Sequence, residues 1–160
     1  MSALQIEESV RAQKAMNYFL EGYNCSQAIV LAFEDLYDMD RETILKLSSS
    51  FGGGMGRLRE VCGSVSGMFM VAGLLYGYDD PRAPTQKADH YVRIQELAEP
   101  FREQNGSIVC RELLGLKNKG ADAPTPEART AEYYKKRPCK ELVGMSAVIM
   151  EEYIGTHPFR

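Results

Sequence analysis

The stretch VCGSVSGMFMVAGLLY, residues 61–76, is the longest apolar run in the chain and decides the fold class. It is shorter than the ~20 residues that a membrane-spanning helix needs, and glycines and serines interrupt it. Its apolar side chains recur every three or four positions, which is the spacing of one helix face. We therefore expect a helix buried in a protein core, with no membrane association; the face comprises Cys62, Val65, Phe69, Ala72 and Tyr76.

The flanking sequence repeats this helical spacing almost everywhere, whereas alternating patterns bounded by hairpin turns are scarce. A chain of 160 residues suits one domain that buries roughly 70% of the surface exposed in its unfolded form. We predict a single compact multi-helix domain of the all-α class over residues 1–160, with cysteines at helix N-termini. The other expected helices cover residues 6–20, 25–37, 42–49, 108–114 and 127–134, one begins at 85 and is kinked or ended by Pro100, and the last begins at 138.

Charge and the N-terminal sequence narrow the function classes. The net charge is −3, so the chain lacks the basic footprint of a nucleic-acid-binding protein. The first residues show neither the basic nor the apolar region of a secretory signal. We expect a cytoplasmic protein that binds no nucleic acid.

The chain has four cysteines, Cys25, Cys62, Cys110 and Cys139. Thiols are normally kept reduced in the cytoplasm, so structural disulfides are not the first interpretation. No two of these cysteines form a CxxC, which leaves out zinc-finger and thioredoxin-like spacings. Any site that they share must therefore be assembled by the tertiary fold.

Each cysteine falls in the first turn of an expected helix and on its apolar face. Helix N-termini carry partial positive charge and unpaired N–H groups, which lower thiol pKa values to ~3.5–7.5 in reactive sites. We expect Cys139 to be the most acidic thiol, because the basic run of residues 135–137 precedes it. Four thiolates that meet could hold a metal, an iron–sulfur cluster or two exchanging disulfides. Buried cysteine is also a small inert hydrophobe, and that interpretation stays open.

A glycine-rich loop, FGGGMG at residues 51–56, precedes Cys62. It lacks the Lys-Ser/Thr of a phosphate-binding P-loop and follows no expected strand. We expect its glycines to adopt positive φ and to bring backbone N–H groups close to a sulfur, that of Cys62 in particular. The glycines assigned to the site are Gly53, Gly54, Gly63 and Gly67.

The segments GYNCSQA at 22–28, FGGGMG at 51–56 and CGSVSG at 62–67, followed by Cys110 and Cys139, resemble the redox-active family named for the pattern C…GCAxxG…C…C. The resemblance covers residues 10–154, and Ser64 stands where the pattern has Ala. It implies a helical, redox-active protein. Similar domains occur in split-Soret cytochrome c proteins with an iron–sulfur centre, which implies a cluster as one option for the four cysteines. The resemblance implies no heme, since the chain lacks CxxCH.

The sequence thus predicts a redox protein, an electron carrier or oxidoreductase, whose four cysteines form one metal–thiolate, iron–sulfur or thiol–disulfide centre. A metal is favoured slightly, because four inward thiolates suit tetrahedral coordination. The alternative is a structural or interaction protein whose cysteines bind zinc or form a stabilising disulfide. The redox partner, a protein or a small molecule, and the oligomeric state, including a homo-oligomer, stay open.

Overall fold

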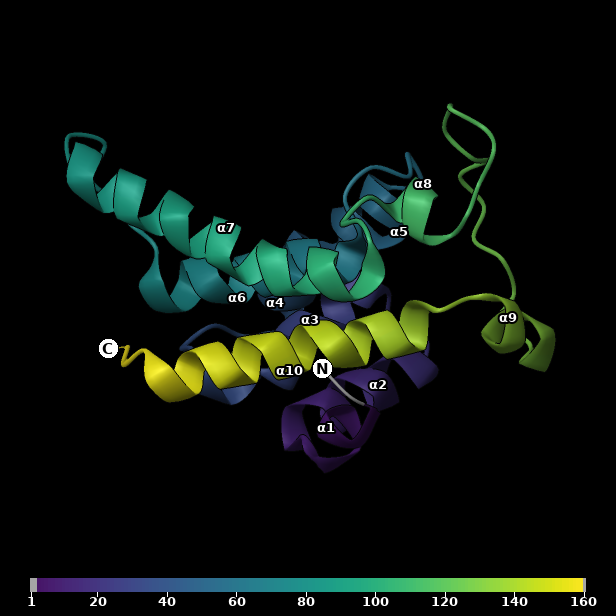
Figure 1. The fold of residues 1–160 in the computed structure, drawn as a ribbon, viewed down its shortest axis with the longest axis horizontal. Coiled ribbons are helices and arrows are strands. Elements are labelled where there is room, and N and C mark those ends of the chain that lie inside the picture. The colour runs from purple at the N-terminus through teal and green to yellow at the C-terminus, as the bar shows by residue number, and fades with distance from the viewer. Residues whose placement is uncertain (1–2, 160) are drawn as a thin grey trace.

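The computed structural model describes residues 3–159, and the elements of this part are helical, which confirms the all-α class (Figure 1). Within the described part, two extended segments pair in an isolated antiparallel bridge between Val61 and Val109. In chain order, the elements are α1 (Ala3–Glu8), α2 (Val10–Leu20), α3 (Cys25–Ala32), η1 (Glu34–Leu36), α4 (Arg41–Ser48), η2 (Ser49–Phe51), α5 (Gly52–Met55), α6 (Gly63–Tyr76), α7 (Pro84–Asn105), α8 (Cys110–Leu113), α9 (Ala131–Lys136) and α10 (Cys139–Thr156).

Helix α3 lies at the centre of the core. Its side chains from Ala28 to Ala32 are buried, as expected of a helix that is apolar on all sides. Helices α2, α4, α6 and α10 pack around it, and α10 also crosses α7. The central helix, packed against these four helices, therefore fixes the position of its first residue, Cys25. The largest fully buried side chains around it are Phe19, Phe33, Phe101, Ile29, Leu31, Met68, Leu97 and Met150.

Helix α6 is the buried helix predicted from the longest apolar run. Gly67 faces α3, where a Cβ atom would lie only 2.9 Å from Cβ of Ile29 and 2.9 Å from the carbonyl oxygen of Ser26. The missing side chain lets the two helices approach closely. Within residues 3–159, no helix is both long enough and apolar enough to cross a membrane.

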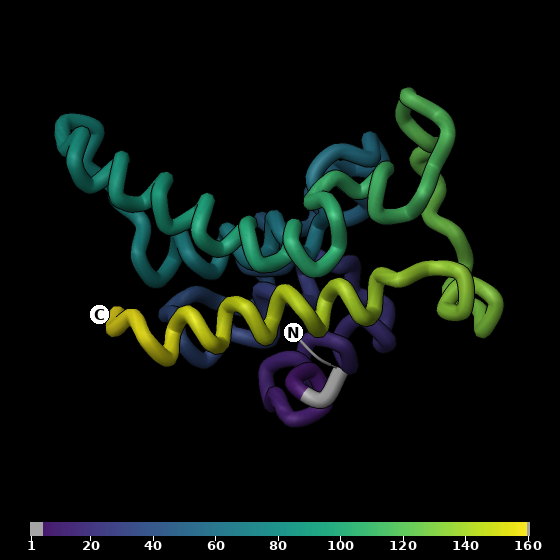
Figure 2. The backbone as a smooth tube through the Cα atoms, in the orientation of Figure 1, coloured from purple at the N-terminus to yellow at the C-terminus, as the bar shows by residue number. Residues whose placement is uncertain are grey.

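Pro100 does not end helix α7, which continues to Asn105 and is capped by Gly106 with φ 82°. Proline removes one helical hydrogen bond, but Leu97, Ala98 and Phe101 are buried and hold both sides of Pro100 in place. The N-terminal half of α7 extends away from the rest of the molecule (Figure 2).

Local capping explains where other boundaries differ from the prediction. Ser9 divides the expected helix 6–20 in two, since its Oγ accepts from the N–H of Ala12 and caps α2. Helix α3 ends at Ala32, five residues earlier than predicted, and Phe33 (φ −118°) is its C-cap. Thr130 caps α9, so this helix starts at Ala131 instead of 127. A capping box starts α3: Asn24 Oδ1 accepts from the N–H of Gln27, whose Oε1 accepts from the N–H of Asn24.

The first testable consequence concerns the contact between α10 and the start of α2. Glu151 Oε2 accepts hydrogen bonds from Ser9 Oγ (3.1 Å) and from the N–H of Arg11 (3.1 Å). Because it satisfies a helix N-terminus from a distant helix, Glu151→Ala should lower the free energy of unfolding by about 1–2 kcal/mol. Urea denaturation measures this loss. Glu152→Ala, at the exposed neighbouring position, is the control; equal losses in both variants would contradict the proposed cap.

Candidate functional site

All four cysteines lie at helix starts, as predicted. Cys25, Cys110 and Cys139 are the first residues of α3, α8 and α10, and Cys62 is the N-cap of α6. Cys110 was expected at the third position of its helix and occupies the first. None of the four forms a disulfide.

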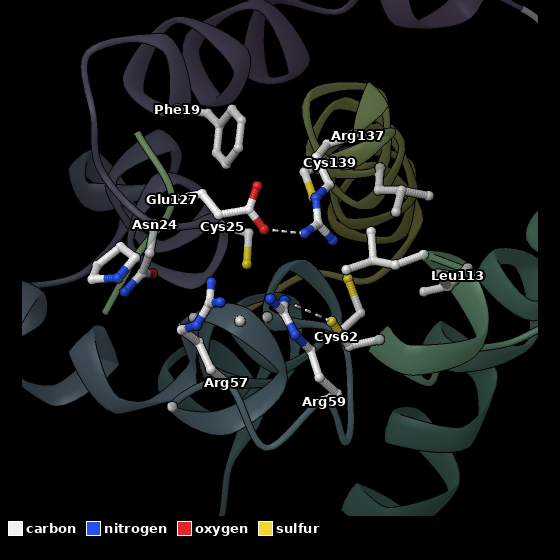
Figure 3. Close-up of a pocket in the computed structure, with 18 of the residues that line it drawn as sticks. Phe19, Asn24, Cys25, Arg57, Arg59, Cys62, Leu113, Glu127, Arg137 and Cys139 are labelled. Carbon is white, nitrogen blue, oxygen red and sulfur yellow. Dashed lines mark hydrogen bonds and ion pairs between the residues drawn. The ribbon is translucent and has the colours of Figure 1, made fainter. Parts of the chain in front are cut away.

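The four cysteines line one pocket of about 300 Å³ (Figure 3). The pocket lies where the starts of α3, α6, α8 and α10 meet, so the tertiary fold brings together residues that are far apart in the sequence. Its lining also contains Phe19, Asn24, Gly53, Arg57, Arg59, Gly63, Glu127, Arg129, Tyr133 and Arg137.

Cys25 lies against two glycine segments. A Cβ atom on Gly63 would lie 2.3 Å from Cys25 Sγ, so only glycine permits this approach. The backbone N–H of Gly53 faces the same sulfur and favours its ionised form. The glycine loop therefore borders the pocket, but its amide is directed at Cys25 instead of Cys62 as predicted.

Cys110 lies against the same loop. A Cβ atom on Gly54 would be 2.6 Å from Cys110 Cβ. Gly53 faces Cys25 and its neighbour Gly54 contacts Cys110, so the two cysteines border consecutive residues of one loop. The guanidinium of Arg59 lies 3.7 Å from Cys110 Sγ and places a positive charge beside this sulfur.

Cys62 is positioned by a short antiparallel pairing of two backbone segments and by the buried hydroxyl groups of two serines. Its N–H donates to the carbonyl of Ile108 (2.8 Å), next to the Val61–Val109 bridge, which brings the segments of Cys62 and Cys110 side by side. Its Sγ is 3.1 Å from Ser64 Oγ, which accepts from Ser146 Oγ at 3.0 Å. These hydroxyls fix the orientation of Cys62 from α6 and α10.

Of the glycines assigned to the site, Gly53 and Gly63 are in the pocket lining. Gly54 and Gly67 are not in the lining formed by the described residues: Gly54 packs behind Cys110, and Gly67 belongs to the contact between α3 and α6. Their lack of a side chain serves close packing.

The thiols are less acidic than predicted. Burial raises the pKa of Cys62 and of Cys139 to about 12, and it raises the pKa of Cys25. Neighbouring thiols add to this effect, since a negative charge on one opposes ionisation of the next. The prediction of an acidic Cys139 is thus wrong: Lys135 and Lys136 are exposed, and although Arg137 acts to lower the pKa of Cys139, burial outweighs it.

Residues 114–130, here called the strap, connect α8 to α9 along one end of the molecule (Figure 2). Asp122 Oδ2 accepts from Arg59 Nε (2.8 Å), and the carbonyl of Ala123 accepts from Arg57 Nε (2.6 Å). Arg129 donates to the carbonyls of Phe19 and Tyr23 and stacks 4.0 Å from the Phe19 ring. Residues 117–126 are exposed along much of their length, yet these contacts anchor the strap over the pocket.

The backbone between Gly53 and Arg59 is strained. Gly53, Gly54 and Gly56 have positive φ as predicted, but so do the non-glycine residues Met55 (69°), Arg57 (68°) and Arg59 (64°). Each non-glycine residue with positive φ lowers the stability of the fold by about 1–3 kcal/mol, and residues strained in this way cluster at functional sites. Sequence reasoning missed both arginines. The available signal was their position immediately after the glycine loop.

The fit of a metal ion can be tested on the donor atoms. Among residues 3–159, no group of three His, Cys, Asp or Glu side chains is placed to hold one metal ion. Four thiolates around a single zinc ion would each have to lie ~2.3 Å from it. The arrangement does not fit a mononuclear tetrathiolate site.

Comparison with known proteins gives one match. A family model described as "Putative redox-active protein (C_GCAxxG_C_C)" matches residues 23–153. No curated protein and no solved structure gives a significant match. The matched range contains all four cysteines, the glycine loop and the strap.

Alanine substitutions at two glycines with nearly the same φ distinguish the stability lost through backbone strain from that lost through close packing. Gly54 (φ 68°) has no room for a Cβ beside Cys110, whereas a Cβ on Gly56 (φ 62°) would lie 3.9 Å from its nearest neighbour. Gly56→Ala should lose only the ~1–2 kcal/mol of a left-handed alanine. Gly54→Ala should lose clearly more stability in urea denaturation and should speed alkylation of Cys110. Equal losses would show that the loop does not pack against this cysteine.

The raised thiol pKa values predict a stability that falls in alkaline solution. The pKa of a cysteine thiol is ~8.5 in an unfolded chain. In the folded chain, burial raises the pKa of Cys62 and of Cys139 to about 12. Between these values the unfolded state binds fewer protons, so stability is fully present below pH ~8.5 and is lost as the pH rises. Urea denaturation of the reduced, metal-free protein between about pH 7.5 and 10 measures the slope. Cys62→Ala should make it shallower, and an unchanged slope would contradict the assignment.

Proposed function

The chain belongs to the C_GCAxxG_C_C family of redox-active proteins, and we propose that its four cysteines form one thiol–disulfide redox centre. One observation carries this proposal: four reduced cysteines at helix starts line a single pocket. Within this centre, Cys110 and Cys25 are the reacting pair, because the consecutive glycines 53 and 54 contact one sulfur-bearing side chain each.

Cys110 is the nucleophile in this proposal. A nearby cation supports a thiolate, and Arg59 lies against this sulfur with a side chain that is only 6% exposed. The Cys110 thiolate attacks one sulfur of a substrate disulfide, forms a mixed disulfide and expels the other half as a thiolate.

Cys25 resolves the mixed disulfide. Its thiol loses a proton and attacks the Cys110 sulfur, which forms the Cys25–Cys110 disulfide and releases the second half of the substrate as a thiolate. Together the two cysteines give up two electrons and two protons, and the substrate disulfide becomes two thiols. The reverse sequence reduces the protein again at the expense of dithiols.

An iron–sulfur cluster is the second candidate, favoured by the position of all four cysteines around one cavity. The four ligands of a cubane cluster bind different iron atoms, so they need not converge on one point as zinc ligands must. Cys25, Cys62, Cys110 and Cys139 would hold the cluster, with the N–H of Gly53 directed at the Cys25 sulfur. Such a group would supply one-electron transfer.

Anaerobic purification followed by titration with a disulfide tests the proposal. We expect a colourless, metal-free protein that takes up two oxidising equivalents and shows one Cys25–Cys110 disulfide by peptide mass mapping. Cys25→Ser should trap the substrate half on Cys110, because the resolving thiol is missing, whereas Cys110→Ser should trap none on Cys25. A brown protein with bound iron and sulfide would establish the cluster instead. A disulfide that forms but resists reduction by dithiols would indicate a structural role.

A further inference from the structure

Four arginines line the thiol pocket: Arg57, Arg59, Arg129 and Arg137. Glu127 is the one carboxylate among the described lining residues, and Asp122 borders the pocket through its ion pair with Arg59. The thiols are neutral where burial keeps them protonated. The described part of the lining therefore contains more arginines than carboxylates.

Two of these arginines have structural partners. Arg129 is bound to the carbonyls of Phe19 and Tyr23, which attaches the strap to α2. Arg137 is paired with Glu127, next to Cys139. These contacts explain the presence of Arg129 and Arg137 without any ligand.

Arg57 and Arg59 both project from the strained segment into the pocket (Figure 3). Each also holds the strap through its Nε–H, Arg57 through Ala123 and Arg59 through Asp122, and Arg57 Nη2 lies 3.9 Å from Asp122 Oδ2. Guanidinium groups bind planar anions through paired N–H groups. Glycine adopts positive φ without strain, whereas both of these positions combine the left-handed backbone with a long cationic side chain.

We propose that the pocket binds a small disulfide that carries a carboxylate, with Arg57 as the anion-binding residue. The inference rests on the proposed thiol–disulfide function and specifies its substrate class. Arg59 contacts the nucleophilic sulfur, and Arg57 lies two residues away, within ~7 Å along the chain. A carboxylate on Arg57 would therefore lie a few bonds from a disulfide sulfur at Cys110.

The pocket size agrees with a small molecule. About 300 Å³ is at the lower end of ligand pockets, which span ~300–1,000 Å³. The exchange is the one described above: the disulfide gains two electrons and two protons from Cys110 and Cys25, and the carboxylate is unchanged. Arg57 binds and orients the substrate through this carboxylate.

The test uses three symmetric disulfides of nearly equal size. These are the disulfides of mercaptopropionate, mercaptoethanol and cysteamine, which are dianionic, neutral and dicationic. Rates of oxidation of the reduced full chain are measured anaerobically at low salt, and each is divided by the rate with a free small thiol. We expect the dianionic disulfide to be favoured over the neutral one by about tenfold or more, and this ratio to fall with added salt.

Substitutions at Arg57 locate the preference. Arg57→Asn should lower the dianionic-to-neutral ratio several-fold, since asparagine tolerates positive φ but carries no charge. Arg57→Lys should restore part of the ratio. Arg102→Asn, on the exposed surface of α7, is the control and should leave the ratio unchanged.

The outcomes separate the two proposals. Oxidation by all three disulfides at equal normalised rates would overturn the anionic substrate class and leave the thiol–disulfide function standing. A ratio that survives Arg57→Asn would overturn the role of Arg57. Failure of every disulfide to oxidise the protein would overturn the proposed function itself.

Discussion

The close approach of polypeptide at Gly54 and Gly63 is the constraint on which the rest of the site depends. At both positions a single added carbon would overlap a cysteine side chain, Cys110 in one case and Cys25 in the other. The start of α6 can therefore lie against the start of α3, and the glycine loop can lie against the start of α8. This contact brings together four helix N-termini from distant parts of the sequence, and it requires the positive φ angles of the loop.

Burial and position at a helix start act on the thiols in opposite directions. The helix N-terminus and the N–H of Gly53 favour a thiolate, but enclosure among apolar groups and other thiols favours the protonated form, and enclosure dominates for Cys62 and Cys139. Cys110 has the guanidinium of Arg59 beside its sulfur. In the proposed thiol–disulfide centre, oxidation would remove the conflict, since two neutral thiols would become one uncharged bond.

Helices and cysteine positions were predictable from the sequence because their causes are local. Asn24 with Gln27 defines the start of α3, and the apolar run defines α6. The acidity of Cys139 was predicted wrongly, since it depends on burial by segments far along the chain. Arg57 and Arg59 escaped notice because no sequence rule assigns positive φ to arginine. The anchoring of the strap could not be predicted, since its anchors, Asp122 and Arg129, find their partners only in the folded molecule.

The strap has a kinetic consequence. Its contacts with Arg57 and Arg59 join it to the same side chains that project into the pocket, so a molecule of substrate size cannot displace one without disturbing the other. In the proposed function, a substrate that bound either arginine would compete with the strap for the same guanidinium groups, so binding and movement of the strap would be coupled. Such coupling would hold a half-reacted substrate beside the sulfurs until the strap contacts formed again.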